Sequence, residues 1–203
     1  MDGLRSFVLR SRIRSEKKRE LVKEYSFIKN DISFFSSLTE YPKVNLEIGF
    51  GDGGHIFQRA RLEEKSIFLG CEVYPNGISQ LVYKIKTEKI PNILIHNNDA
   101  RELLENAPND FFSDIYILFP DPWHKKKHHK RRLINTKFIS LLFLKMKPSS
   151  RLLIATDCVD YYNNIVDTGF DFQKKQPEDW ISTKYEKKAL KNSNDVFYLT
   201  LYK

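Results

Sequence analysis

The fold is decided by the stretch Val44-Asn-Leu-Glu-Ile-Gly-Phe-Gly-Asp-Gly-Gly54, which predicts a buried strand over 44–48 and then a glycine-rich turn. A helix is expected to begin directly after the turn. Gly49, Gly51 and Gly53 let the backbone turn tightly and let a ligand approach the main chain closely. A strand that runs through such a turn into a helix is the first unit of an open α/β sheet.

The alternation of strand and helix continues along the chain. Further strands are expected at 67–73, 92–96, 114–119 and 151–156, with helices after Pro75 and over 136–146. Two more strands, 170–174 and 196–202, have little helix between them and predict an antiparallel pair at the end. We therefore expect a doubly wound, Rossmann-like α/β fold. Its seven-stranded, mostly parallel sheet has an antiparallel C-terminal strand and helices on both faces.

Composition indicates one globular domain with a polyanionic partner. The 203 residues are 41% hydrophobic, which suits a full-sized core, and the formal net charge is +8. The N-terminal segment, residues 1–24, is rich in basic residues and is predicted to be an arm separate from the main domain, 25–203. The arm is either a solvated tail or an RNA-contacting segment that orders on binding.

The sequence lacks the usual signs of a metal site, a membrane anchor or a secreted protein. Cys71 and Cys158 are far apart and show no metal-ligand spacing, which fits a reducing cytoplasm. His124, His128 and His129 have no neighbouring acid or cysteine that would complete a metal site. An apolar run long enough to cross a membrane and the apolar core of a signal peptide are both missing. We expect a cytoplasmic, metal-free monomer or homodimer that needs no obligate protein partner.

Acidic residues stand at or just beyond several strand ends. Glu47 lies in the first strand, Glu72 closes the second, and Asp99 follows the third. A carboxylate at the second position can accept both hydroxyls of an adenosine ribose, and Asp99 can meet the adenine edge. Both NAD and S-adenosylmethionine contain adenosine. The glycine spacing, which is not the dinucleotide pattern, and the terminal antiparallel pair favour S-adenosylmethionine.

The stretch Phe119–Arg132 follows the fourth strand and joins a rigid pocket to a basic run. Asp121 lies between Pro120 and Pro122, whose rings fix the backbone φ angle and limit the mobility of the loop. Trp123 can stack on a planar base, or it can pack into the core. The basic residues that follow suit phosphates, although such a run can also be a solvated face. Together they predict chemistry on a nucleobase that is still part of a polymer.

Six segments in order carry a family resemblance: Leu46–Gly53, Gly70–Gly77, Asn98–Ala100, Phe119–Arg132, Ala155–Asp157 and Thr183–Glu186. Over roughly residues 7 to 203, the chain resembles the bacterial tRNA (guanine-N7-)-methyltransferase family, which has the class I S-adenosylmethionine-dependent methyltransferase fold. The Pro-Asp-Pro-Trp segment with its basic run is highly specific for the family, whereas the glycine turn is not.

The resemblance implies an activity and roles for individual residues. The enzyme would transfer a methyl group from S-adenosylmethionine to N7 of a guanine in the variable loop of tRNA, forming 7-methylguanosine. The implied catalytic residue is Asp121. The implied cofactor-binding residues are Glu47, Gly49, Gly51, Gly53, Glu72, Asp99, Ala100 and Asp121. The implied substrate-binding residues are Lys125, Asp157, Thr183, Lys184, Tyr185 and Glu186. The implied RNA contacts are Lys127, His128, His129, Lys130, Arg131 and Arg132.

Guanine N7 carries a free lone pair and no proton, so its attack on a methyl group needs no general base. Placement of the base should therefore be the main contribution of the protein. Asp121 can accept hydrogen bonds from guanine N1–H and the exocyclic amine, which adenine cannot match, and can offset charge that develops on the ring. His55 and His96 are expected to be structural.

The chain departs from the family pattern in three places. Ser149-Ser150 stand where the family has Gly-Gly, Trp180-Ile181 where it has Arg-Pro, and Lys187-Lys188-Ala189 where it has x-Arg-Gly. Tyr185 also replaces a Phe. Two other functions stay open: a non-catalytic RNA-binding protein on a methyltransferase fold, which should have lost cofactor acids, and an NAD-dependent oxidoreductase, which leaves the basic run unexplained.

Overall fold

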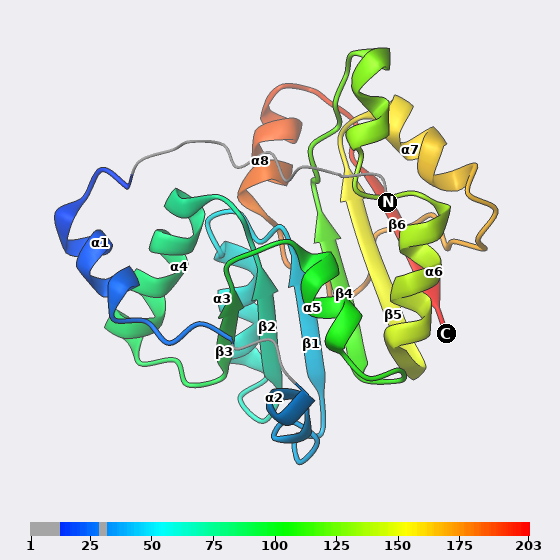
Figure 1. The fold of residues 1–203 in the computed structure, drawn as a ribbon. Helices are drawn as coiled ribbons and strands as arrows, with labels where there is room; N and C mark the ends of the chain where they lie inside the picture. The colour runs from blue at the N-terminus through cyan, green and yellow to red at the C-terminus, as the bar shows by residue number, and fades with distance from the viewer. Residues whose placement is uncertain (1–12, 29–31) are drawn as a thin grey trace.

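The computed structural model describes residues 13–28 and 32–203 and shows one twisted sheet between two layers of helices (Figure 1). The strand order is β3-β2-β1-β4-β5-β6, in which β1 to β5 run parallel and β6 runs antiparallel to β5. The strands are β1 Val44–Ile48, β2 Ile67–Cys71, β3 Ile93–His96, β4 Phe112–Leu118, β5 Met146–Thr156 and β6 Phe197–Tyr202. The predicted doubly wound α/β fold is confirmed.

Helices cover both faces of the sheet. In the described part of the chain they are α1 Glu16–Lys23, α2 Ile32–Ser36, α3 Gly54–Leu62, α4 Pro75–Glu88, α5 Ala100–Asn106, the 3-10 helix η1 Lys126–Arg131, α6 Thr136–Lys145, α7 Val159–Val166 and α8 Lys184–Lys191. Apolar side chains of α2, α5, α6 and α7 pack on one face. Those of α1, α3 and α4 pack on the other. Within the described residues, none of these helices is long and apolar enough to cross a membrane.

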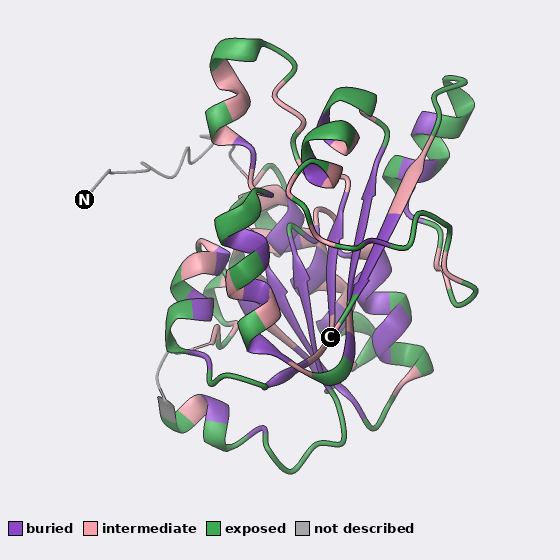
Figure 2. Cartoon of the chain, turned by 90° about the vertical axis from the view of Figure 1, so that its right-hand side faces the viewer, coloured by how far each residue is buried: buried purple, intermediate pink, exposed green. Residues whose placement is uncertain are grey.

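The alternation of side chains along each strand divides the core between the two faces. In β4, Ile115 and Ile117 join the core beneath α5 and α6, while Tyr116 and Leu118 face the opposite side. All four side chains are buried, as Figure 2 shows for most of the sheet. Burying a large apolar side chain contributes roughly 1.5–3 kcal/mol, so these strands hold the sheet rigidly beneath the loops at its edge.

The strand order reverses between β1 and β4. From β1 the chain proceeds outward through β2 to β3, and it then returns to the other side of β1 to form β4. Connections that leave two neighbouring parallel strands in opposite directions open a crevice at the strands' carboxyl ends, where doubly wound proteins bind ligands. The glycine turn follows β1 and the loop of Asp121 follows β4, so both lie at this crevice.

The C-terminal third differs from the prediction in two ways. Residues 170–174 do not form a strand, because only Gln173 bridges to Thr200 of β6, and the sheet therefore has six strands instead of seven. The antiparallel partner of β6 is β5, with Arg151 opposite Tyr202. Helix α8 also occupies the region in which little helix was expected.

The N-terminal segment is folded where the structure describes it. Helix α1 lies along α4 (Figure 1), and the ammonium groups of Lys17 and Lys18 lie 5.6 and 5.2 Å from the ring centroid of Tyr83. Leu21 of α1 packs against the core, and the Tyr25 hydroxyl donates to the carbonyl of Ile93 at 3.2 Å. Residues 13–24 of the predicted arm therefore rest on the domain, and residues 1–12 lie outside the described residues.

Candidate active site

The glycine turn is pressed against the start of α4. A Cβ atom on Gly77 would lie 2.1 Å from the carbonyl oxygen of Gly51, so only glycine fits at position 77. Gly51 itself has a φ of 57°, which a side chain rarely tolerates. Gly49 and Gly53 have φ angles of 74° and 72°. The backbone of the turn is thus closely packed against the start of α4 at the crevice.

Glu72 follows β2 and ties the glycine turn to the start of α4. Its carboxylate accepts hydrogen bonds from the backbone N–H groups of Gly51, Val73 and Tyr74 at 2.8, 2.7 and 2.9 Å. Burial raises the pKa of Glu72, and the nearby charge of Asp121 raises it further, against the lowering effect of these three bonds. The carboxylate is held at the position that suits the hydroxyls of a ribose.

Asp99 is fixed at the start of α5. Its side chain accepts from the backbone N–H of Arg101 at 2.9 Å, as an N-cap, and from the Arg101 guanidinium at 2.8 Å. Ala100 is buried directly beside it. A cavity of about 260 Å³ lies nearby, lined by Ile13, Val22, Phe27, Val73, Pro75, Ile78, Asn97 and Asn98. Its mainly apolar walls and two amides suit a flat heteroaromatic ring such as adenine.

Glu47 and His55 form a buried pair beneath the glycine turn. The Nδ1 atom of His55 lies 2.7 Å from Oε2 of Glu47, and the two side chains are only 3% and 4% exposed. Both line a cavity of about 320 Å³ between the end of β1 and the end of β4. The wall opposite is formed by Leu118 and by residues 182–185 and 187.

The loop that carries Asp121 contains two residues with left-handed backbone conformation and is held by one buried arginine. Phe119 and Trp123 have φ angles of 54° and 47°, an uncommon conformation for residues with side chains. The Nε–H group of Arg132 donates to the Pro122 carbonyl at 2.8 Å. Asp121 itself is exposed at the tip of the loop. These contacts hold the backbone on both sides of Asp121.

Arg132 differs from the rest of the basic run. It is only 5% exposed, and its guanidinium also binds Asp160, Asn164 and His129. These contacts favour a role in holding the loop over the direct RNA contact that the sequence predicted for this residue. Lys125, Lys127 and Lys130 are exposed, and within the described residues they take part in no ion pair.

Trp123 packs against the basic run, outside the core. The guanidinium carbon of Arg131 lies 5.0 Å from the centroid of the Trp123 ring, and the His128 ring meets its edge at 5.9 Å. The half-buried indole thereby fastens η1 to the loop. Among the described residues, no group of three or more His, Cys, Asp or Glu is placed to hold a metal ion.

Helix α8 brings the predicted substrate residues 183–186 across the crevice. Thr183 caps the helix by accepting from the backbone N–H of Glu186 at 3.0 Å, and the Glu186 carboxylate accepts from Trp180 Nε1 at 2.9 Å and from the Tyr198 hydroxyl. Thr183 and Glu186 are thus buried within the protein, while Lys184 and Tyr185 are exposed.

Tyr185 joins the glycine turn to the Asp121 loop. Its ring stacks on Phe119 with centroids 6.4 Å apart, and its Cε2 atom would lie 3.2 Å from a Cβ on Gly51. Burial and then the charges of Asp52, Glu72 and Asp121 raise the pKa of Tyr185. Three of the predicted site segments therefore converge on one tyrosine. Asp157 is exposed just after β5, at the same edge of the sheet.

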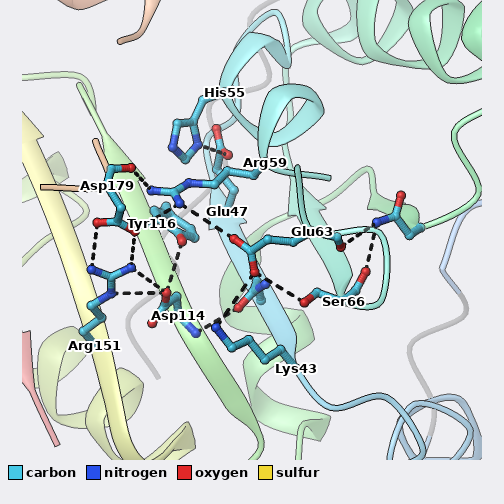
Figure 3. A network of polar contacts seen from close by, with 12 residues as sticks. Lys43, Glu47, His55, Arg59, Glu63, Ser66, Asp114, Tyr116, Arg151 and Asp179 are labelled. Carbon is cyan, nitrogen blue, oxygen red and sulfur yellow. Dashed lines mark hydrogen bonds and ion pairs between the residues drawn. The ribbon is translucent and has the colours of Figure 1, made fainter. Parts of the chain in front are cut away.

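A network of charged residues, absent from the sequence prediction, anchors the segment before α8 (Figure 3). Arg59 of α3 donates to the Asp179 carboxylate at 3.1 Å and to its carbonyl at 2.7 Å. Arg151 of β5 binds Asp179 at 2.5 and 2.9 Å and Asp114 at 3.0 Å. Arg59 and Asp179 are 120 residues apart, so no local pattern could reveal the pairing. We call Arg59, Asp179, Arg151 and Asp114 the arginine clamp.

Comparison with known proteins gives a consistent result. A family model described as "Putative methyltransferase" matches residues 42–199. A tRNA (guanine-N(7)-)-methyltransferase of Wolbachia pipientis wMel is 36% identical, covering 94% of this chain and 88% of that protein. The enzyme of the same name from Neorickettsia sennetsu is 38% identical, covering 76% of this chain and 71% of that protein.

Solved structures show the same fold. The 16S rRNA methyltransferase KamB is similar with a TM-score of 0.62 and 16% identity, over 87% of this chain and 94% of that chain. Haemonchus contortus phosphoethanolamine N-methyltransferase 2, solved in complex with S-adenosyl-L-methionine, is similar with a TM-score of 0.54 and 13% identity. That likeness covers 92% of this chain and 52% of the other.

Proposed function

Because the chain belongs to the tRNA (guanine-N(7)-)-methyltransferase family, we propose that the guanine it methylates at N7 lies in the variable loop of tRNA. The methyl donor is S-adenosylmethionine. The observation that supports methyl transfer at this site is the convergence on Tyr185, which touches the glycine turn and Phe119 and lies near the charges of Glu72 and Asp121. A methyl donor on the cofactor side and a base on the loop side would meet there.

The residues present fit the cofactor. The fixed Glu72 carboxylate suits the ribose, the cavity beside Asn98 suits the adenine, and the cavity beside Glu47 can hold the amino-acid tail. A Cβ on Gly49 would have no atom within 4 Å, so the turn leaves open space for a ligand there. When bound, S-adenosylmethionine supplies an electrophilic methyl group on a positively charged sulfur.

Asp121 would hold the guanine. As a carboxylate it accepts hydrogen bonds from guanine N1–H and the exocyclic amine, a pair of donors that adenine does not offer. The proline rings and Arg132 keep the loop from moving, so the base is oriented before reaction. Because guanine N7 carries no proton, no residue needs to act as a base before the bond forms.

The exposed lysines of the basic run would position the tRNA. Lys125, Lys127 and Lys130 stand next to the loop of Asp121 and lack protein partners among the described residues, so their charges are free to meet phosphates. Structured RNA is recognised mainly by shape and backbone, so these contacts would set the position of the substrate more than its sequence. We place this activity in the cytoplasm, with a monomer or homodimer as the working form.

Methyl transfer to unmodified tRNA tests the function. With methyl-labelled S-adenosylmethionine, nucleoside analysis should find the label in 7-methylguanosine alone. A control tRNA whose variable-loop guanine is replaced by adenine should stay unlabelled. Label in another nucleoside would contradict the assignment. Tight tRNA binding without any label would instead support the non-catalytic RNA-binding protein.

A further inference from the structure

His55 carries a buried polar atom with no partner. The Nε2 atom has no hydrogen-bond partner within the described residues, although Nδ1 is bonded to Glu47. The ring is fixed on both sides, since its centroid lies 4.9 Å from that of Tyr116 and 6.4 Å from that of Trp180. A buried polar group left unsatisfied costs roughly 1–3 kcal/mol. An unsatisfied buried atom on a residue that lines a cavity points to a ligand group.

The position of the cavity identifies which part of the cofactor reaches it. The adenosine half is accounted for by Glu72 and by the cavity beside Asn98, at the ends of β2 and β3. The methyl group must face the Asp121 loop at the end of β4. The cavity that His55 lines is bounded by the glycine turn, by Leu118 and by residues 182–185, between the ends of β1 and β4. The remaining part of the cofactor is its amino-acid tail, which bears an ammonium and a carboxylate.

The hydrogen bond to Glu47 determines what His55 offers to that tail. A carboxylate only accepts hydrogen bonds, so a proton lies on Nδ1, and a ring that carries only this proton bears a lone pair at Nε2. Glu47 lines the same cavity with its own acceptor oxygens. Two acceptors side by side suit the three N–H donors of an ammonium group. Lys184 and Lys187 also line the cavity and suit the carboxylate of the tail.

We propose that His55 is a positioning residue that accepts a hydrogen bond at Nε2 from the ammonium group of the cofactor's amino-acid tail, beside Glu47. His55 thereby orients the cofactor so that its methyl group faces the loop of Asp121. The inference rests on the cofactor assignment made above, and it revises the expectation that this histidine is only structural. A role limited to holding Glu47 would leave Nε2 without a function.

The substitution His55→Asn tests the role of Nε2 separately from that of Nδ1. The asparagine amide reaches about as far as Nδ1 and can still donate to Glu47, but it has nothing at the position of Nε2. Binding is measured by calorimetry with three probes: S-adenosylhomocysteine, its decarboxylated form, which keeps the amine, and methylthioadenosine, which lacks the whole tail. The variant should bind both amine-bearing probes about tenfold or more weakly, and it should bind methylthioadenosine as the wild type does.

The pattern across the probes decides the outcome. An equal loss with all three would show a merely structural role, and a loss with S-adenosylhomocysteine alone would assign Nε2 to the carboxylate. Either result, or no loss at all, overturns the proposal. Failure of the wild type to bind S-adenosylhomocysteine would instead refute the cofactor assignment. If His55→Asn does not fold, His55→Gln, whose amide oxygen reaches the position of Nε2, should retain a preference for the amine-bearing probes over methylthioadenosine. Loss of that preference overturns the proposal.

Discussion

The two halves of the active site differ in whether their charged side chains have partners within the protein. On the side of β1 to β3, each acid is held by partners within the protein: Glu47 by His55, Glu72 by three backbone N–H groups, and Asp99 by the start of α5. On the side of β4, Asp121 is exposed, and Lys125, Lys127 and Lys130 take part in no ion pair in the described part of the chain.

The difference indicates when each half acquires its final interactions. The cofactor half is arranged before any ligand arrives, so its affinity should depend little on salt, because buried contacts are weakly screened. The RNA half keeps its charges in water until phosphates replace the solvent. Its affinity should therefore fall steeply as the salt concentration rises.

Replacing Asp121 should have the largest effect and tests whether the two halves are separable. Asp121→Asn keeps the shape of the side chain but presents an amide that cannot accept from both guanine donors. We expect single-turnover methylation to slow by about 10²- to 10³-fold. The affinity for S-adenosylhomocysteine, measured by calorimetry, should change far less. A loss of cofactor affinity as large as the loss of rate would make cofactor binding, the second role that the family resemblance implies for Asp121, its main role.

Replacing Glu72 should have the next largest effect and makes the cofactor half sensitive to pH. Burial raises the pKa of Glu72, and the carboxylate form must accept from the ribose. The wild-type affinity for S-adenosylhomocysteine should therefore fall as the pH drops through a value above the usual range of glutamate. Glu72→Gln should bind about 10- to 100-fold more weakly at neutral pH, with a flat profile in that range. Parallel profiles for the two proteins would show that another group is responsible.

Replacing one lysine should have the smallest effect and sharpens the salt comparison. Lys130→Ala should weaken tRNA binding only a few-fold and reduce the magnitude of the slope of log affinity against log salt by about 0.7 to 0.9. Filter binding over a salt series measures both. Lys65→Ala is the matched control. Lys65 is exposed just before β2, at the amino ends of the parallel strands, whereas the basic run follows the carboxyl end of β4. An unchanged slope for Lys130→Ala would remove this residue from the RNA surface.

The sequence predicted the sheet well where strands are apolar and buried on both faces. The strand over 44–48 was predicted with the bounds that it has, and the acids at the strand ends follow from those bounds. The prediction of a strand over 170–174 was wrong, because the alternating aromatic side chains of this segment pack on the core without forming a strand. Phe172 is buried and Phe170 packs on the core, while only Gln173 pairs with β6.

The sequence indicates helix α8 and the arginine clamp less clearly than it indicates the strands. The helix has only eight residues and buries only Glu186 and Ala189, so its sequence offers few apolar positions at helical spacing. The pair Thr183 and Glu186 has the spacing of a capping box and could have marked the helix start. The clamp joins residues from α3, β4, β5 and the segment before α8, and contacts between such distant positions have no local signature.

The arginine clamp has a kinetic consequence. Fixing the backbone of one residue costs roughly 1–2 kcal/mol, and a recognition loop that orders only on contact adds this cost to every encounter. Arg59 and Arg151 hold Asp179 in the folded protein, so the segment that leads to Tyr185 already has its shape. Productive collisions with RNA then need only the right approach, and the association rate should follow electrostatic steering without a slow rearrangement phase.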